Sequence, residues 1–507
     1  MSLTLTQFLS WSLVTVIIWV QSFSGTNSTF PGYSSQLKQL LSLSQRHLNY
    51  FAFASDAGKL LGFISGLAAS HFPGLDWLVL LIGSILGLIG YGLQYLAIKF
   101  HITFLLSFWS FLVLSFIAGH SICWMNTVCL VFIQKFKSNH QVAAGIITSY
   151  QGLSTKIYTD IVHVVSSAPG KRAQHYLLLN AILPMIVCVI FIANVVALKI
   201  DAVGLGEPRN MRVAFLLMFV ITIFTGAYSI ISSSLSIKIL PWVNATVIGL
   251  FLLAPLTVIP IVEKVREKSN GDLGRMEKEG EDDKETQVVV REEIVVVREE
   301  IGWKLMLQRL NFWLYIVVYF LGPTIGLIFL NNLGQIVESR GYAGTAFVPL
   351  SSSFGFFGRL IPSFIDYYIR HKISRPALVA ILMVPEAAAF ILLLSSANTS
   401  LFISTAIIGT CTGAISSIAI SITAELFGTV NFPVNHNIMV ANIPLGSLVF
   451  GQLASHVYHK EGVLSGDGKC IGMECYRSTF ILWGSLCCLG FFIALVLYAR
   501  TRKFYSQ

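Results

Sequence analysis

Apolar stretches of about twenty residues recur along almost the whole chain, and they constrain its fold more than any other feature. A helix needs roughly 20 mostly apolar residues to cross the hydrocarbon core of a bilayer. Hydrophobic residues make up 55% of the 507-residue chain and charged residues only 12%, whereas soluble domains carry about 25% charged residues. Because no water-soluble core hides so much apolar surface, we predict an all-α polytopic membrane protein.

The apolar stretches fall into groups of six, two and six. The first group lies at 8–30, 50–70, 77–97, 103–133, 141–166 and 175–198. The pair follows at 211–236 and 241–263, and the last group lies at 311–331, 343–367, 376–395, 400–426, 436–456 and 478–499. This grouping predicts an N-terminal six-span bundle at 1–200, two accessory spans at 201–263 and a C-terminal six-span bundle at 311–507. The total is 12 to 14 transmembrane helices.

The segment 264–310 is the one clearly polar stretch, and it contains 12 of the 25 acidic residues. We predict a solvated cytoplasmic linker here. The sequence VVVREE occurs twice in it, at 288–293 and 295–300. Such a repeat could form a short amphipathic helix on the membrane or on a partner, although a plain solvated loop is the default interpretation.

The balance of Lys and Arg between the two faces says little about the orientation of the chain in the membrane. We therefore infer the orientation from the number of spans and from features of the loops. An even number of spans puts both termini on one side, predicted to be the cytoplasm. The acceptor sequons at Asn27, Asn244 and Asn398 then fall at outer span ends. The first span lacks a preceding Lys or Arg and is interpreted as a retained span, not a signal peptide. The predicted location is the plasma membrane or an endomembrane such as the vacuole.

Two of the eight cysteines, Cys470 and Cys475, lie in a polar loop on the predicted outer side. Their spacing suits a local disulfide in an oxidising compartment, or a metal pair in a reducing one. We favour the disulfide and predict no metal site, because no neighbouring Cys or His completes a zinc-binding set.

The second span of each predicted bundle carries a glycine followed by a cation and a leucine. These tripeptides are Gly58-Lys59-Leu60 and Gly358-Arg359-Leu360. Many transporters consist of two related halves with the substrate site between them. The matching tripeptides therefore support an architecture of two related six-span halves.

Several longer segments resemble one family. They include QSFSGTNSTFPGYSSQLKQLLSLSQRHLN and ASDAGKLLG near the N-terminus, and AELFGTVNF, NIPLGSLVFG, CIGMECYRSTF and RTRKFY in the last third. These segments resemble the plant nodulin-like proteins of the nuclear fusion defective group within the major facilitator superfamily. The resemblance covers nearly the whole chain, with the nodulin-like region extending to about residue 263. It implies a major facilitator-type fold and a transport role, and it supplies no agreed substrate.

A charged loop in the C-terminal half resembles a motif of the wider superfamily that joins the second and third spans of a half. FGRLIPSFIDYYIRHKISRP supplies Arg359, Asp366 and Arg370 as gate candidates, whereas the matching SGLAASHFPG has no acidic or basic residue besides a histidine. If the motif latches the inner gate by ion pairs, only one half keeps a charged latch. Glu425, at the inner end of its span, is a further gate candidate.

Ionisable groups inside spans are costly unless they are paired or wetted, so each is a functional candidate. Asp56 and Lys59 lie three residues apart on one helix face. They are either a coupling or substrate pair facing a central cavity or a structural ion pair.

The fifth span has the densest set of polar side chains: Tyr150, Gln151, Lys156, Asp160 and His163. A lysine facing a central cavity could hold an organic anion, and a carboxylate beside a histidine could exchange a proton. The alternative is that the last two side chains are merely wetted in the outer headgroup layer. The family resemblance implies small or neutral residues at these two positions, so Lys156 and Asp160 depart from it.

Glu386 follows Pro385 in an otherwise apolar span. It is the strongest single candidate for a protonatable coupling residue. A buried neutral carboxylic acid hydrogen-bonded to a neighbour is an equally weighted alternative.

These features favour a secondary transporter that moves a small polar or anionic solute by alternating access, and the carboxylates within spans add the expectation of proton coupling. The alternative is a non-transporting receptor or scaffold that signals through the linker; a channel finds no selectivity-filter motif. No phosphate-binding loop, H-E-x-x-H or G-x-S-x-G motif occurs, so we predict no enzyme, no cofactor and no ATP-driven pump. The expected partners are a small-molecule substrate and membrane lipid. Nucleic acid is not expected, because the basic residues sit in short segments between spans.

Overall fold

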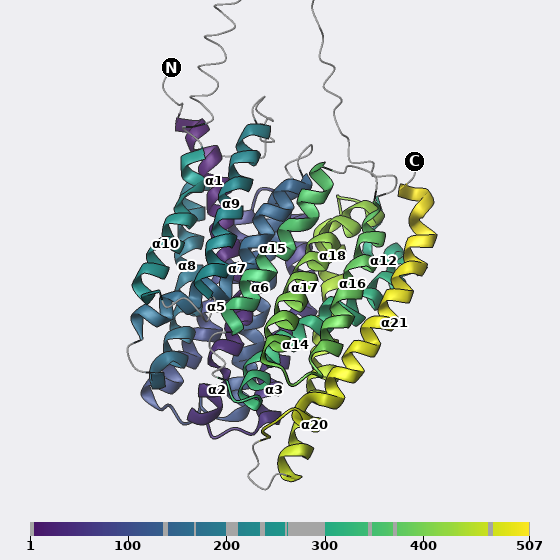
Figure 1. Ribbon diagram of the computed structural model, residues 1–507. Helices are drawn as coiled ribbons and strands as arrows, with labels where there is room; N and C mark the ends of the chain where they lie inside the picture. Colours follow the sequence, from purple (N-terminus) through teal and green to yellow (C-terminus); the bar gives the residue numbers. More distant parts are fainter. Residues whose placement is uncertain are drawn as a thin grey trace, which may run out of the picture.

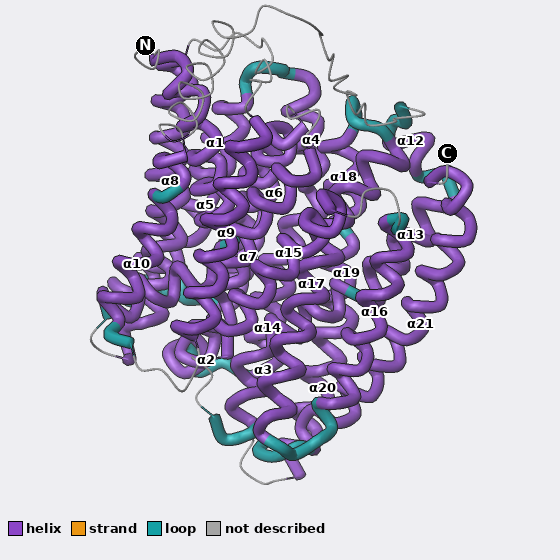
Figure 2. The backbone as a smooth tube through the Cα atoms, turned by 45° about the horizontal axis from the view of Figure 1, so that its top comes forward, coloured by secondary structure: helices purple, strands orange, loops and turns teal. Residues whose placement is uncertain are grey.

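A computed structural model describes residues 5–134, 140–166, 169–198, 211–233, 239–258, 261, 300–342, 347–368, 373–464 and 470–505. Within these ranges the chain is helical and contains no strand (Figure 2). The predicted all-α fold is confirmed. The linker up to residue 299, with the first VVVREE repeat, lies outside the described residues, as does Arg370.

The N-terminal half runs from the first helix to α8. Its helices are α1 (Leu5–Ser24), η1 (Thr26–Thr29), α2 (Phe30–Leu40), α3 (Gln45–Ala57), η2 (Gly58–Leu61), α4 (Gly62–His71), α5 (Asp76–Phe100), α6 (Phe108–Gln134), α7 (His140–Val165), η3 (Pro169–Lys171) and α8 (Arg172–Leu198). The accessory helices are α9 (Met211–Ser233) and α10 (Pro241–Leu253).

The C-terminal half begins after the linker. Its helices are α12 (Trp303–Met306), α13 (Leu310–Leu321), α14 (Pro323–Ser339), α15 (Phe347–Tyr368), α16 (Arg375–Leu392), α17 (Asn398–Phe427), α18 (Phe432–Val440), α19 (Asn442–Gly446), η4 (Ser447–Gly451), α20 (Gln452–Leu464) and α21 (Glu474–Tyr505). Helices occur at each predicted span. Ten helices of the described part are long and apolar enough to cross a membrane.

Several of the described spans are broken near their middle, and the break between α13 and α14 has a clear local cause. The first span of the C-terminal half breaks between α13 and α14 at Gly322 and Pro323. Proline lacks an N–H and pushes the residue before it out of the helical region, and Gly322 has φ −108° and ψ −100°. The second span turns through the short helix η2, and the fifth span of the C-terminal half changes from α18 to α20 through α19 and η4. Broken helices of this kind often form the binding site of a transporter.

The helices run roughly along one common direction, with both chain ends at the same end of the molecule (Figure 1). The opposite end carries α2 and α20. The N-terminal and C-terminal halves lie side by side, and α7 packs along α15 where they meet. The accessory helix α9 contacts both α7 and α15, so it covers one side of the seam between the halves.

Two of the three sequons are placed inside the protein. The side chain of Asn244 is 9% exposed, and its Oδ1 accepts a hydrogen bond of 2.9 Å from the hydroxyl of Tyr228. Asn27 lines the central cavity and donates to Asp56. Both side chains are hydrogen-bonded within the protein, and the expectation that these two sequons fall at outer span ends stays a prediction. The side chain of Asn398 lies outside the described residues.

Candidate functional site

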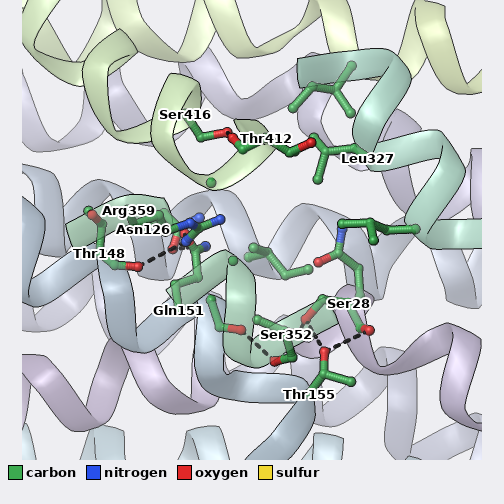
Figure 3. Close-up of a pocket in the computed structure, with 18 of the residues that line it drawn as sticks. Ser28, Asn126, Thr148, Gln151, Thr155, Leu327, Ser352, Arg359, Thr412 and Ser416 are labelled. Carbon is green, nitrogen blue, oxygen red and sulfur yellow. Dashed lines mark hydrogen bonds between the residues drawn. The ribbon is translucent and has the colours of Figure 1, made fainter. Parts of the chain in front are cut away.

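A cavity of about 220 Å³ lies between the two halves. Side chains of α1, α3, η2, α6 and α7 line it from one half, and side chains of α14, α15 and α17 to α19 from the other. Most of the polar lining consists of hydroxyl and amide groups, as the close-up in Figure 3 shows. Three of the lining residues have an acidic side chain or a Lys or Arg side chain: Asp56, Lys59 and Arg359. The matched cations of the two tripeptides therefore reach one common space.

Asp56 and Lys59 form an ion pair in the cavity wall, with 2.6 Å between Nζ and Oδ1. The last turn of α3 carries the aspartate, and η2 carries the lysine. The carboxylate also accepts from Asn27 Nδ2 at 3.4 Å and from Asn331 Nδ2 at 3.3 Å. Asn331 belongs to α14, so the Asp56 carboxylate connects the two halves. The predicted pair is both an ion pair and a part of the cavity lining.

Arg359 reaches the cavity from α15 and is held by neutral groups of the other half. Its Nη1 donates to the carbonyl oxygen of Thr148 at 3.0 Å and to Oε1 of Gln151 at 2.7 Å. Gln151 in turn donates from Nε2 to Asn126 Oδ1 at 3.0 Å (Figure 3). The guanidinium has no carboxylate partner among the described residues, and its buried Nε has no hydrogen-bond partner there. We expected Arg359 at an inner gate, but the structure places it in the cavity beside Gln151.

The other fifth-span candidates do not line the cavity. Lys156 and Asp160 form a buried pair one helical turn apart, with 2.6 Å and 2.7 Å from Nζ to the two carboxylate oxygens. They are 2% and 4% exposed. Tyr150 is fully buried and packs edge-on against Phe356. In this structure Lys156 turns toward Asp160 and not toward the cavity.

Glu386 on α16 lies behind the cavity wall. It is fully buried, and its Oε1 accepts one hydrogen bond of 3.3 Å from Thr412, which lines the cavity. The other carboxyl oxygen has no hydrogen-bond partner in the described part of the chain. Gly326 makes room for this contact, because a Cβ there would lie 2.7 Å from Glu386 Oε1. Glu386 is therefore one side chain away from the cavity.

Charged groups also meet at the end of the C-terminal half that faces the linker. Glu425 at the end of α17 pairs with Arg375 at the start of α16. Glu300, the last residue of the second VVVREE repeat, accepts hydrogen bonds from the backbone N–H groups of Thr429 and Val430 at 3.1 and 3.0 Å. The side chain of Asp366, like Arg370, falls outside the described residues.

The loop after α20 lies at the opposite end of the molecule from the termini (Figure 1). A disulfide joins Cys470 of this loop to Cys475 at the start of α21, and their Cα atoms are 5.7 Å apart. The N–H of Gly472 donates to the carbonyl oxygen of Ser339 at 2.7 Å, so this loop is attached to the end of α14.

The two halves touch at both ends of the cavity. On the side of the disulfide loop, Gln335 Nε2 donates to Ser34 Oγ at 3.0 Å and Asn49 Nδ2 to the Gly451 carbonyl at 2.9 Å. On the side of the termini, Asn437 Nδ2 donates to Thr127 Oγ1 at 3.0 Å. Hydrogen bonds between the two halves therefore lie on both sides of the cavity.

Sequence reasoning missed several neutral residues of this site, notably Asn27, Asn126, Asn331 and Thr412. It concentrated on ionisable groups within spans, and Gln151 was the one neutral amide among the candidates. The sequence signal that could have found these residues is an amide or hydroxyl group within an apolar span. Such groups are too common in this chain to single out the lining residues. It also missed Glu300, which nothing in the linker distinguishes from its acidic neighbours.

Comparison with known families gives two matches that together cover most of the chain. A family model described as Nodulin-like matches residues 10–261, and one described as NFD4, C-terminal domain, matches residues 293–507. The chain is 36% identical over 528 residues to Protein NUCLEAR FUSION DEFECTIVE 4 of Arabidopsis thaliana, covering 98% of this chain and 90% of that protein. It is also 25% identical over 189 residues to Probable transporter MCH1 of Yarrowia lipolytica, covering 34% of this chain and 39% of that protein.

Solved structures with a similar fold are transporters of the major facilitator superfamily. The proton:xylose symporter XylE superposes with a TM-score of 0.54 at 12% identity, covering 97% of this chain and 95% of that chain. A structure of proton dependent oligopeptide transporters gives a TM-score of 0.54 at 12% identity, covering 98% of this chain and 99% of the other. The predicted major facilitator-type fold is confirmed.

Proposed function

The chain belongs to the nodulin-like family of nuclear fusion defective proteins, and from this premise we propose that it is a secondary transporter moving a small polar solute by alternating access. The main observation behind this proposal is the polar cavity between the halves, with a different set of contacts between the halves on each side of it. If one set breaks while the other holds, the cavity opens to one side only. We propose no enzymatic reaction for this protein.

The size and lining of the cavity support a small solute. Its volume of about 220 Å³ lies below the range of about 300–1,000 Å³ that is usual for pockets of drug-sized ligands. At a share of about 30 Å³ per water molecule, it equals about seven waters. Amide and hydroxyl groups around it would replace the hydration shell of a polar solute.

Proton coupling is part of the proposal, with Glu386 as the coupling residue. This carboxyl group is fully buried, has one oxygen without a hydrogen bond, and reaches the cavity through Thr412. A carboxyl group buried in a membrane without a counter-charge is costly when ionised, which favours exchange of a proton during the cycle. Two of the similar solved structures are named as proton symporters; a shared fold alone would not carry this mechanism.

For the orientation, we propose cytoplasmic termini and a lumenal or extracellular disulfide loop, in the plasma membrane or an endomembrane such as the vacuole. The support is that the disulfide loop and the two termini lie at opposite ends of the molecule. A bond between cysteines persists on the oxidising side of a membrane. We also propose that 1–200 and 311–507 act as the two moving bodies, with 201–263 as accessory spans and 264–310 as the linker.

The test is uptake into vesicles that contain the purified full chain, with and without an imposed pH gradient. A carrier should show saturable uptake of at least one small polar solute and faster uptake when a labelled solute exchanges against the same solute inside. Conductance without saturation would indicate a channel and contradict the proposal.

A receptor or scaffold that signals through the linker is the second candidate. The observation in its favour is Glu300, which attaches the end of the linker to the loop between α17 and α18. Deletion of 264–299 separates the two functions. A transporter should keep its uptake after this deletion, whereas a scaffold should lose a bound partner and show no uptake in either form.

A further inference from the structure

The formal charges of the cavity lining do not cancel. Asp56 and Lys59 neutralise each other at 2.6 Å, and the carboxylate is further satisfied by two asparagine amides. Arg359 then adds one positive charge for which the described residues supply no carboxylate. His436, which also lines the cavity, adds none in its neutral form. The lining as a whole therefore carries a net charge of one positive unit.

Arg359 is positioned to bind a ligand in the cavity. Its Nη1 is fixed by two neutral oxygens of α7, which orient the guanidinium without neutralising it. Its Nε is buried and without a partner in the described part, although a buried N–H normally finds an acceptor. Because Nε has no accessible surface, a solute in the cavity would meet the terminal nitrogens of the guanidinium.

From these observations we infer that the cavity takes a small organic monocarboxylate, with Arg359 binding its carboxylate group. This inference rests on the proposed transport function and narrows its substrate class. A guanidinium presents a planar fork of N–H donors that matches the two oxygens of a carboxylate. A single negative charge balances the single positive charge of the lining, whereas a dianion would leave one charge uncompensated in a closed space.

The rest of the lining fits the body of such a solute. Leu327 and Leu330 from α14 supply apolar surface, and the hydroxyl groups of Ser28 and Thr155 lie 2.9 Å apart on the other side. A short chain bearing a hydroxyl or carbonyl group would find both kinds of contact. The volume of about 220 Å³ admits such a solute.

The experiment compares L-lactate with lactamide, which has the same shape but no charge. Binding of each to the purified full chain is measured by thermal shift, next to pyruvate, malate, inorganic phosphate and D-xylose. A ligand that binds the folded state raises its unfolding temperature. We expect stabilisation by lactate and pyruvate and none by lactamide or xylose. Equal stabilisation by lactate and lactamide, or stabilisation by phosphate or xylose but by no carboxylate, would overturn the assignment.

Variants locate the binding group. Arg359→Gln should weaken lactate binding about 10- to 100-fold, the range for losing a hydrogen bond to a charged group, while Arg359→Lys should keep part of it. Arg477→Gln is the matched control, because Arg477 is exposed on α21 and lies outside the cavity. Lactate binding to a folded Arg359→Gln protein at wild-type strength would also overturn the assignment. Should that variant not fold, the comparison of lactate with lactamide on the wild-type protein still decides.

Counterflow into vesicles distinguishes this inference from the proposed function. If xylose exchanges and lactate neither binds nor exchanges, the carrier stands and the carboxylate assignment fails. If lactate binds through Arg359 but no probe crosses the membrane, the anion site stands and the carrier proposal fails.

Discussion

The two halves of the molecule hold their buried charges in different ways. In the N-terminal half, Asp56 pairs with Lys59 and Lys156 with Asp160, each with 2.6 Å between the charged atoms and each within one helical turn. In the middle of the C-terminal half, Arg359 and Glu386 hydrogen-bond only to neutral groups in the described part of the chain. The Arg375–Glu425 pair of that half lies at helix ends.

This difference refines the rule that every ionisable group within a span is a functional candidate. In an ion pair on one helix, the attraction between the two charges offsets part of the desolvation cost. Such a pair needs no ligand to neutralise it. A lone buried charge has no such compensation for its desolvation cost. A residue of this kind is therefore expected where a solute or a proton interacts with it. We therefore expect the N-terminal pairs to act mainly on folding and on the charge of the cavity, and the C-terminal residues to act on transport.

The largest effect is predicted for Lys156→Met. The substitution leaves the Asp160 carboxylate buried without its cation, and breaking a buried pair in this way costs about 3–5 kcal/mol. Thermal unfolding of the purified protein should show a clearly lower midpoint. The double variant Lys156→Met, Asp160→Leu should recover most of the loss, because it removes both charges. A single variant as stable as the wild type would show that the pair does not support the fold.

The second prediction changes the charge of the cavity. Asp56→Asn raises its net charge from one to two positive units, and Lys59→Gln lowers it to zero. At separations of several Å, a charge change of this kind is worth about 1.4 kcal/mol or more. The affinity for malate should therefore rise about tenfold in the first variant, and lactate affinity should fall about tenfold in the second.

The matched control is the double variant Asp56→Asn, Lys59→Gln. It restores one positive unit and should restore the preference for a monocarboxylate. Titration of malate and lactate by thermal shift measures all three proteins. Unchanged ratios of the two affinities across the variants would show that the lining charges do not select the solute.

The sequence predicted the fold well because apolar length determines membrane spans almost independently of tertiary contacts. It also predicted that the two cations of the matching tripeptides hold equivalent places, and Lys59 and Arg359 do meet in one cavity. Helix boundaries were less accurate where a span breaks. The second span was expected at 50–70, whereas its first helix begins at Gln45.

The rotation of each helix could not be predicted, and this explains most of the errors in the site. Neighbouring residues of a helix point about 100° apart, so Thr155 lines the cavity while Lys156 faces Asp160. A helix in contact with other helices on most sides has no clear apolar stripe that reveals its orientation. Nor does the sequence show which polar groups of the two halves meet, as Asp56 and Asn331 do.

The third prediction tests the lone carboxyl group. Glu386→Gln keeps an acceptor for Thr412 but holds no exchangeable proton. Uptake driven by a pH gradient should fall severalfold, to the rate seen without a gradient, while solute binding and the unfolding midpoint stay close to those of the wild type. Uptake that responds to the gradient as strongly as in the wild type would exclude Glu386 as the coupling residue.

The smallest effect is predicted for Asn331→Ala, with Asn27→Ala as its matched partner. Both variants remove one long hydrogen bond to Asp56, at 3.3 and 3.4 Å, and each should cost about 0.5–1.5 kcal/mol of stability. Only Asn331 reaches Asp56 from the other half, so only its loss should change the rate of counterflow, by a fewfold. Equal counterflow rates in the two variants would mean that the contact between the halves at Asp56 is not broken and remade during the transport cycle.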